Sequence, residues 1–171
     1  MDVFDAIEGR RSVRAFKDEP VGDDVVKKII GAGLDAPSAG NLQARRFWIV
    51  RKHAKKESLA KAALGQSFIA EAPVSIVVCA DLARIKPYGE RGRDLYCIQD
   101  SAASVQNMLL AIHALGLASC WVGAFEESEV SSALALPGKY RPLAILPIGV
   151  PARNPKRPKR HPPEEEAEWV L

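Results

Sequence analysis

The sequence predicts an α+β fold in a single domain. Helical stretches outnumber strand-like ones, and the strands do not alternate regularly with the helices, which disfavours a doubly wound sheet. The chain has 171 residues, of which 47% are hydrophobic and 26% charged, enough for one core of ordinary size. We therefore expect a central mixed or antiparallel sheet flanked by helices, followed by an extended tail over residues 151–171.

Hydrophobic spacing and turn-forming residues predict the elements of the first half of the chain. Apolar residues at helical spacing indicate helices, and short β-branched or aromatic runs indicate strands. Pro, Ser, Gly and Asn close together indicate a loop. The predicted elements are a short amphipathic segment over 3–7, a helix over 25–34, a loop over 36–43, a strand over 47–50, an exposed helix over 55–64 and a buried central strand over 74–80.

The second half of the chain contains the strongest periodic signal. Apolar residues recur every three or four positions from Asp94 to Leu115, which predicts a helix about 30 Å long. Because apolar and small residues cover most of its circumference, we expect it between the sheet and a second subunit. Pro147 indicates that the last strand lies at an edge or is irregular there. The other predicted elements are a polar loop or lid over 85–93, an inner strand and turn over 118–125, a short helix over 126–134 and the last strand over 143–150.

Composition and charge exclude several classes of protein. The longest apolar runs are strand-sized and the N-terminus does not resemble a signal peptide, so we expect a cytoplasmic protein with no membrane contact. Three widely spaced cysteines in apolar surroundings and only three histidines disfavour a disulfide frame or a metal site. A formal net charge of +3 does not by itself indicate nucleic acid.

A cluster of cationic side chains follows the first helical segment. If this segment is extended, Arg10, Ser12 and Arg14 point to one side, and Arg11 and Val13 point to the other. Two guanidinium groups and a hydroxyl directed at one place suit a phosphate or a planar imide and carbonyl edge. Arginine-rich stretches of this kind are also typical of a solvated surface, and the segment alone leaves both interpretations open.

The chain lacks the glycine motifs that bind nucleotides. No G-x-G-x-x-G follows a predicted strand, and no G-x-x-x-x-G-K-[ST] occurs. A nucleotide-like cofactor would therefore be held by side chains and a loop, because no glycine cradle at a helix N-terminus is present to hold it.

Four segments, in this order, resemble the FMN-dependent nitroreductase family. They are Arg10-Arg-Ser-Val-Arg-Ala-Phe16, Ala36-Pro-Ser-Ala-Gly-Asn-Leu-Gln43, Cys120-Trp-Val-Gly-Ala-Phe125, and Pro147-Ile-Gly-Val-Pro151 with basic residues after it. The resemblance covers essentially the whole chain. It implies an α+β fold and an intertwined homodimer, with two FMN sites at the interface and a C-terminal tail that crosses to the partner.

The resemblance also implies the residues of the flavin site. The implied cofactor-binding residues are Arg10, Arg11, Ser12 and Arg14 from the basic segment, Pro37, Ser38, Asn41 and Gln43 from the loop of the other protomer, Trp121, Gly123 and Ala124 against the isoalloxazine ring, Gly149, and Lys159 and Arg160 from the tail. Ser38 and Asn41 are equally compatible with a role confined to shaping the turn, and Trp121 with a place in the core. The basic tail also suits a solvated arm.

The implied activity is hydride transfer from NADH or NADPH, through flavin N5, to a flat acceptor such as a nitroaromatic or a quinone, with ping-pong kinetics. No catalytic acid, base or nucleophile is implied. Two alternatives stay open: superfamily variants that dehalogenate reductively or break down flavin, and a non-catalytic module that binds a polyanion such as nucleic acid. The short lid favours an open face for the acceptor, and Tyr88, Arg91, Tyr96 and Asp100 lie close to it in sequence.

Overall fold

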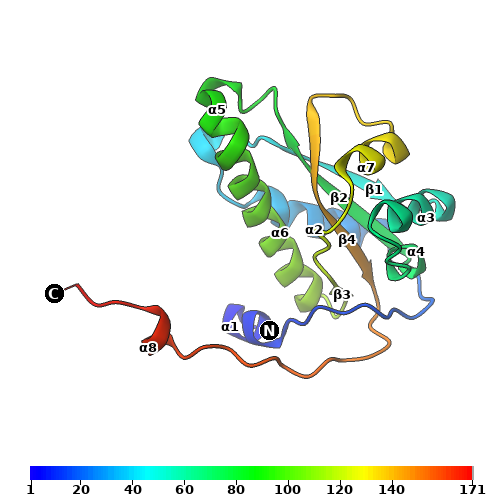
Figure 1. Ribbon diagram of the computed structural model, residues 1–171. Coiled ribbons are helices and arrows are strands. Elements are labelled where there is room, and N and C mark those ends of the chain that lie inside the picture. Colours follow the sequence, from blue (N-terminus) through cyan, green and yellow to red (C-terminus); the bar gives the residue numbers. More distant parts are fainter. Residues whose placement is uncertain (171) are drawn as a thin grey trace.

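The protein has an α+β fold in which helices cover both faces of one antiparallel sheet (Figure 1). The computed structural model describes residues 1–170. The sheet has the strand order β1-β2-β4-β3, and all three neighbouring pairs are antiparallel. Its strands are β1 (Arg45–Val50), β2 (Val74–Asp81), β3 (Ala118–Ser119) and β4 (Tyr140–Gly149). The predicted fold class is therefore confirmed, with a sheet of the antiparallel kind.

The helices divide into two layers. Helices α2 and α6 pack on one face of the sheet, and α3, α4 and α7 pack on the other, each layer enclosing its own apolar cluster. The helices are α1 (Val3–Gly9), α2 (Asp23–Leu34), α3 (His53–Ala62), α4 (Phe68–Glu71), α5 (Gly89–Arg91), α6 (Cys97–Ala114), α7 (Glu127–Leu134) and α8 (Pro163–Glu166). Each predicted helix is present, with bounds shifted by a few residues.

Strand β2 is central, as its apolar sequence predicts. All eight of its residues are buried. Because successive side chains of a strand point to opposite faces, Ile76 and Val78 join the α2/α6 cluster while Val77 and Cys79 join the α3/α4/α7 cluster. Burial in the second cluster raises the pKa of the Cys79 thiol to about 12. One strand thus connects the two halves of the core.

The prediction that the last strand lies at an edge is wrong. Strand β4 pairs with β2 along its length and with β3 near its end. The interruption expected at Pro147 is present on the β3 side, where pairing stops at Ile148 and resumes only as a single bridge between Ile145 and Val122. A proline has no N–H to donate, so it is tolerated in a central strand at the point where the ladder is broken.

Two other predictions need correction. The inner strand expected within 118–125 is reduced to two residues, and pairing with β4 resumes only at the single bridge between Val122 and Ile145. The segment over 85–93, expected to be a loop, consists of short helical turns that lead directly into α6. Isolated turns of this length carry little periodic signal, so sequence polarity alone did not reveal them.

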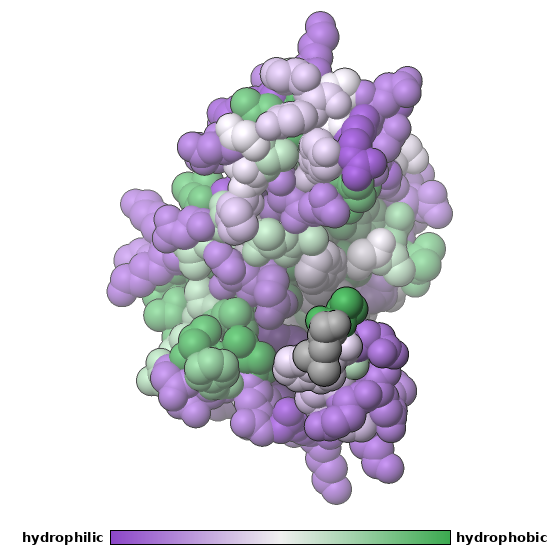
Figure 2. Space-filling view, turned by 90° about the vertical axis from the view of Figure 1, so that its left-hand side faces the viewer, coloured by the Kyte–Doolittle hydropathy of each residue, from purple (hydrophilic) through white to green (hydrophobic). Residues whose placement is uncertain are grey.

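The apolar residues of α1 face outward. Val3, Phe4 and Ile7 are 58%, 77% and 53% exposed, and Ile98 and Leu115 at the two ends of α6 are also exposed. Figure 2 views the molecule from the left-hand side of Figure 1 and shows apolar groups among polar ones on that side. Within residues 1–170, no helix combines the length and apolar character that crossing a membrane requires.

Candidate functional site

The basic segment after α1 runs extended beside β3. The Val13 N–H donates to the Ser119 carbonyl at 3.0 Å, and Ser12 and Ser119 form a parallel bridge. Further along, Phe16 forms an antiparallel bridge with Pro151. Backbone contacts therefore hold this segment at both ends and leave its side chains free for another role.

Ser12 and Val13 lie on opposite sides of this segment as expected, whereas Arg10 and Arg11 reach both sides. Val13 is 3% exposed, whereas Ser12 and Arg14 are exposed. Burial raises the pKa of the Cys120 thiol, and Arg14, Ser12 and Arg10 oppose that rise. Within residues 1–170, no carboxylate forms an ion pair with Arg10 or Arg14. Arg10 and Ser12 line one hollow, whereas the Arg14 guanidinium lies over the Phe68 ring, 6.0 Å from its centroid.

Arg11 behaves differently from its two neighbours. Its Nη1 donates to the carbonyl oxygens of Glu8 at 2.6 Å and of Arg10 at 2.9 Å. The last carbonyls of a helix lack partners within the helix, so Arg11 caps the C-terminus of α1. This contact gives Arg11 a structural role, and its predicted contact with a cofactor stays a prediction.

The C-terminal tail lies against the basic segment of its own chain. Arg157 forms an ion pair with Glu8. A hollow of about 170 Å³ lies between the two segments, and no acidic residue lines it within the part of the chain that the structure describes. Its lining residues are Arg10, Arg11, Ser12, Pro155, Lys156, Pro158 and Arg160. Arg160 thus lies beside Arg10 and Ser12, whereas Lys159 does not line this hollow, and contact of either residue with FMN stays a prediction.

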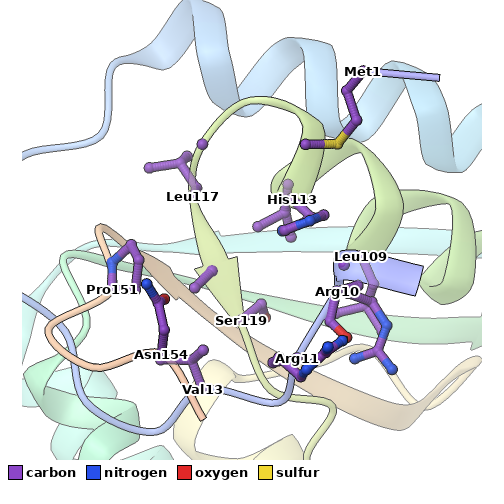
Figure 3. Close-up of a pocket in the computed structure, with 14 residues that line it drawn as sticks. Met1, Arg10, Arg11, Val13, Leu109, His113, Leu117, Ser119, Pro151 and Asn154 are labelled. Carbon is purple, nitrogen blue, oxygen red and sulfur yellow. The ribbon is translucent and has the colours of Figure 1, made fainter. Parts of the chain in front are cut away.

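A second cavity lies on the opposite side of the basic segment. Its volume is about 260 Å³. Val13 lines this cavity, whereas Ser12 lines the first hollow. Figure 3 shows the side chains of Leu117 and His113 on one side of this cavity and those of Val13 and Asn154 on the other. Its walls are mainly apolar, so an anion is better accommodated on the Ser12 side.

The turn after β3 lies next to the basic segment. Trp121 is 41% exposed, which rules out a place in the core. Gly123 and Ala124 are exposed as well, and the nearest atom that a Cβ on Gly123 would meet is Trp121 Nε1, at 3.9 Å. The turn therefore presents an open surface that a planar group can approach.

Gly149 has a packing role that the sequence did not indicate. It is buried in β4, and a Cβ at this position would lie 2.8 Å from Pro73 Cδ and 3.1 Å from Phe16 Cδ1. Any larger residue would push the Phe16 segment away from the sheet. This contact explains the glycine, and a role in cofactor binding stays a prediction.

The predicted loop over 37–43 lies at the other end of the molecule. The Ala39 N–H donates to Asp100 Oδ1 near the start of α6, whereas Gly9 lies against His113 near the end of that helix. Thirteen residues of helix separate Asp100 from His113, or about 20 Å. One chain therefore does not bring the loop and the basic segment together.

The loop has an unusual backbone conformation. Gly40, Asn41 and Gln43 have φ values of 54°, 53° and 50°, in the left-handed region. Ser38 Oγ accepts a hydrogen bond from the Gln43 N–H at 3.0 Å, so Ser38 does shape the turn. The side chains of Asn41 and Gln43 are exposed. Three left-handed residues within four positions indicate a backbone held in place by its surroundings.

Four residues outside the predicted set hold this loop. Arg45 donates to the carbonyl oxygens of Leu34 and Ala36, just before the loop. Asp100 accepts from the Ala39 N–H, and Arg84 Nη1 donates to the Gln43 carbonyl at 3.2 Å. The Tyr88 hydroxyl lies over Gly40, and the Tyr88 ring packs edge-on against the Tyr96 ring, with centroids 5.3 Å apart. Sequence reasoning placed Tyr88 and Asp100 near the lid, but Arg45, which lies before the strand that the sequence predicts over 47–50, gave no signal.

The fold and these two regions define a class: an α+β protein with a cationic segment at one end of its long helix and an exposed loop of left-handed backbone at the other. The sequence matches the Nitroreductase family over residues 7–69 and 60–150. The chain belongs to the nitroreductase family.

Its relatives include proteins named as nitroreductases and flavin reductases. The oxygen-insensitive NADPH nitroreductase of Salmonella typhimurium is 35% identical over 164 residues, which are 91% of this chain and 68% of the relative. The FMN reductase [NAD(P)H] of Bacillus subtilis is 31% identical over 92% of this chain and 70% of its own length. The structure of the NADPH:FMN oxidoreductase of Vibrio harveyi complexed with NAD⁺ has a TM-score of 0.90 and 29% identity, covering 98% of this chain and 76% of that one.

Proposed function

We propose that this protein is an NAD(P)H-dependent FMN oxidoreductase that reduces a flat acceptor such as a nitroaromatic or a quinone. The observation that carries the proposal is the hollow lined by Arg10, Ser12, Lys156 and Arg160 beside an exposed turn, with no acidic residue among its lining within residues 1–170. The relatives named for NAD(P)H, FMN and nitroreductase activity support the same assignment.

The residues present fit FMN. A phosphate suits the hollow between Ser12, Lys156 and Arg160, because cationic and hydroxyl groups line it without an acidic neighbour among the described residues. The flat ring suits the open surface at Trp121 and Gly123. When bound, FMN supplies the hydride chemistry through N5, and this chain's own residues bind, orient and shield it. No side chain is needed as an acid, base or nucleophile.

The site requires two copies of the chain. The loop and the basic segment lie at opposite ends of α6, and the apolar face of α1 is exposed in a single chain. A two-fold axis that makes two α6 helices antiparallel places the loop of one copy beside the basic segment of the other. The same arrangement of two copies also covers Phe4 and Ile7. We therefore propose a homodimer with two flavin sites. The tail beyond Arg160 is free to extend across to the partner, because all its described residues are exposed.

The open turn has room for one planar ligand at a time, either the nicotinamide or the acceptor. The chain has no glycine motif for a separate dinucleotide site, so NAD(P)H and the acceptor are expected to occupy the same place in succession. Turnover is then ping-pong. Plots of reciprocal rate against reciprocal NAD(P)H concentration, measured at several acceptor concentrations, should be parallel, whereas intersecting lines would indicate a ternary complex.

The absorption spectrum provides the first test. The purified protein should be yellow and should release FMN on denaturation, and a colourless protein that does not bind added FMN would refute the assignment. Steady-state oxidation of NADH and of NADPH with quinones, nitroaromatics and halogenated phenols then identifies the acceptor. Rapid loss of iodide or bromide from halogenated phenols would favour the dehalogenase alternative over the reductase.

A further inference from the structure

The loop over 37–43 is held by a buried cation. Arg45 begins β1, is 3% exposed, and turns its guanidinium back under the loop. Its Nη2 donates to the Leu34 carbonyl at 2.6 Å and to the Ala36 carbonyl at 2.8 Å. Burial lowers the pKa of Arg45, and Asp100 opposes that shift. The carbonyl oxygens of Leu34, Ala36 and Pro37 accept hydrogen bonds from this guanidinium, and no carboxylate forms an ion pair with it among residues 1–170.

Asp100 connects this cation to the loop itself. It is 6% exposed on α6, and its Oδ1 accepts from the Ala39 N–H at 2.9 Å. Among residues 1–170, neither Asp100 Oδ2 nor Arg45 Nε has a hydrogen-bond partner, although both atoms are buried. The carboxylate is therefore held by its hydrogen bond from the Ala39 N–H. Through Ala39, α6 fixes the start of the short helical turn that carries Gly40 and Asn41.

We propose that Asp100 and Arg45 are positioning residues for flavin binding. They hold the loop in its left-handed conformation, so the loop is already shaped when the flavin of the neighbouring subunit arrives. Neither side chain touches the flavin in this arrangement, since both lie beneath the loop. A loop free to leave this conformation would have to be reordered on binding, and the affinity would fall accordingly. This inference rests on the proposed FMN-dependent function.

The hydrogen bond to Ala39 can be separated from the charge. Asp100→Ala removes both, whereas Asp100→Asn keeps an oxygen acceptor for the Ala39 N–H and removes only the negative charge. Both variants should lose stability, because each removes the negative charge that favours the charged form of buried Arg45. We expect Asp100→Ala to weaken FMN by about tenfold or more, and Asp100→Asn to bind within about threefold of the unchanged protein.

Lys56 provides a matched control for a general loss of stability. It is also a buried cation, 5% exposed, and its Nζ donates to the carbonyls of Ala70 and Ala72, far along the chain from the loop. Lys56→Met and Arg45→Met should both lower the midpoint of urea unfolding. Only Arg45→Met should weaken FMN, because only Arg45 holds the carbonyls that lead into the loop.

The experiment measures FMN affinity by fluorescence titration, urea midpoints, and amide exchange of the loop peptide in flavin-free protein. The inference predicts faster exchange over 37–43 in Asp100→Ala and Arg45→Met, and slow exchange in Lys56→Met. Unchanged FMN affinity in folded Asp100→Ala, or an equal loss of affinity in Lys56→Met, would overturn it. Failure of the unchanged protein to bind FMN would instead refute the proposed function, while the exchange data would still report on the loop.

Discussion

The two ends of α6 use different means to prepare a binding surface. At the basic end, Arg10 and Arg14 carry charges that no carboxylate neutralises within residues 1–170, on a backbone that makes a few strand-like contacts. At the loop end, a strained backbone is held by buried Arg45 and Asp100 and by Tyr88 above it. We propose that the first end recognises the flavin by charge, and the second by shape. Changes at the basic end should act on binding directly, whereas changes at the loop end should act through conformation.

The largest expected effect comes from preventing the proposed dimer contact that brings the basic segment of one copy beside the loop of the other. Phe4 is 77% exposed in the single chain, so a charge there should be harmless to a monomer. If α1 lies at the dimer interface, Phe4→Asp should produce monomers in sedimentation and abolish stable FMN binding, because one copy cannot complete the site. Leu64→Asp serves as the control, because Leu64 is 69% exposed in the connection after α3. A Phe4→Asp monomer that binds FMN as tightly as before would show that each end of the molecule acts alone.

Removing one cation at the basic end comes next. Arg14→Ala should weaken FMN by about tenfold to a hundredfold, because a charge-assisted contact contributes roughly 1.5–3 kcal/mol. The urea midpoint should hardly change, since the Arg14 side chain is exposed. Arg46 is an exposed arginine on β1 and provides the matched control. Equal affinity of Arg14→Ala and Arg46→Ala in a titration would contradict recognition by charge at this place.

At the loop end, the glycine with the left-handed backbone is the sharpest probe. Gly40 has φ 54°, and a Cβ there would lie 2.5 Å from the Tyr88 hydroxyl. Gly40→Ala should destabilise the fold by about 1–2 kcal/mol and weaken FMN. In contrast, Gly31 lies in α2 with open space around its Cβ position, so Gly31→Ala should stabilise by about 0.5–1 kcal/mol. Thermal unfolding of both variants checks the signs, and a neutral Gly40→Ala would mean that the loop is not rigid.

The smallest expected effect concerns the hydrogen bond inside the loop. Ser38→Ala removes the acceptor of the Gln43 N–H and should cost about 1 kcal/mol, or roughly fivefold in FMN affinity if the loop end works by shape. Ser58, whose hydroxyl donates to the Ala54 carbonyl on the exposed helix α3, is the control. The comparison of the two ends would fail if Ser38→Ala weakened FMN as strongly as Arg14→Ala.

Local chemistry in the sequence was sufficient for much of this protein. The apolar run of β2 and the three-to-four-residue spacing of α6 identify the core elements, because burial requires those patterns regardless of the rest of the chain. The alternation of Ser12 and Val13 between two faces follows from the geometry of an extended backbone alone. Proline and glycine marked the loop over 37–43 for the same local reason.

Only the tertiary structure showed how distant segments support one another. Arg45 lies outside the strand that the sequence predicts over 47–50, and its burial under carbonyls of the preceding segment, beside an Ala39 N–H held by Asp100 from α6, is visible only in the folded chain. Pro147 predicted a strand that is at an edge or irregular there; β4 is central, and the irregularity lies on the β3 side, where the ladder stops at Ile148. The distance along α6 between the basic segment and the loop over 37–43 is likewise set by the tertiary structure. Such facts arise from long-range packing, which local propensity and periodicity do not encode.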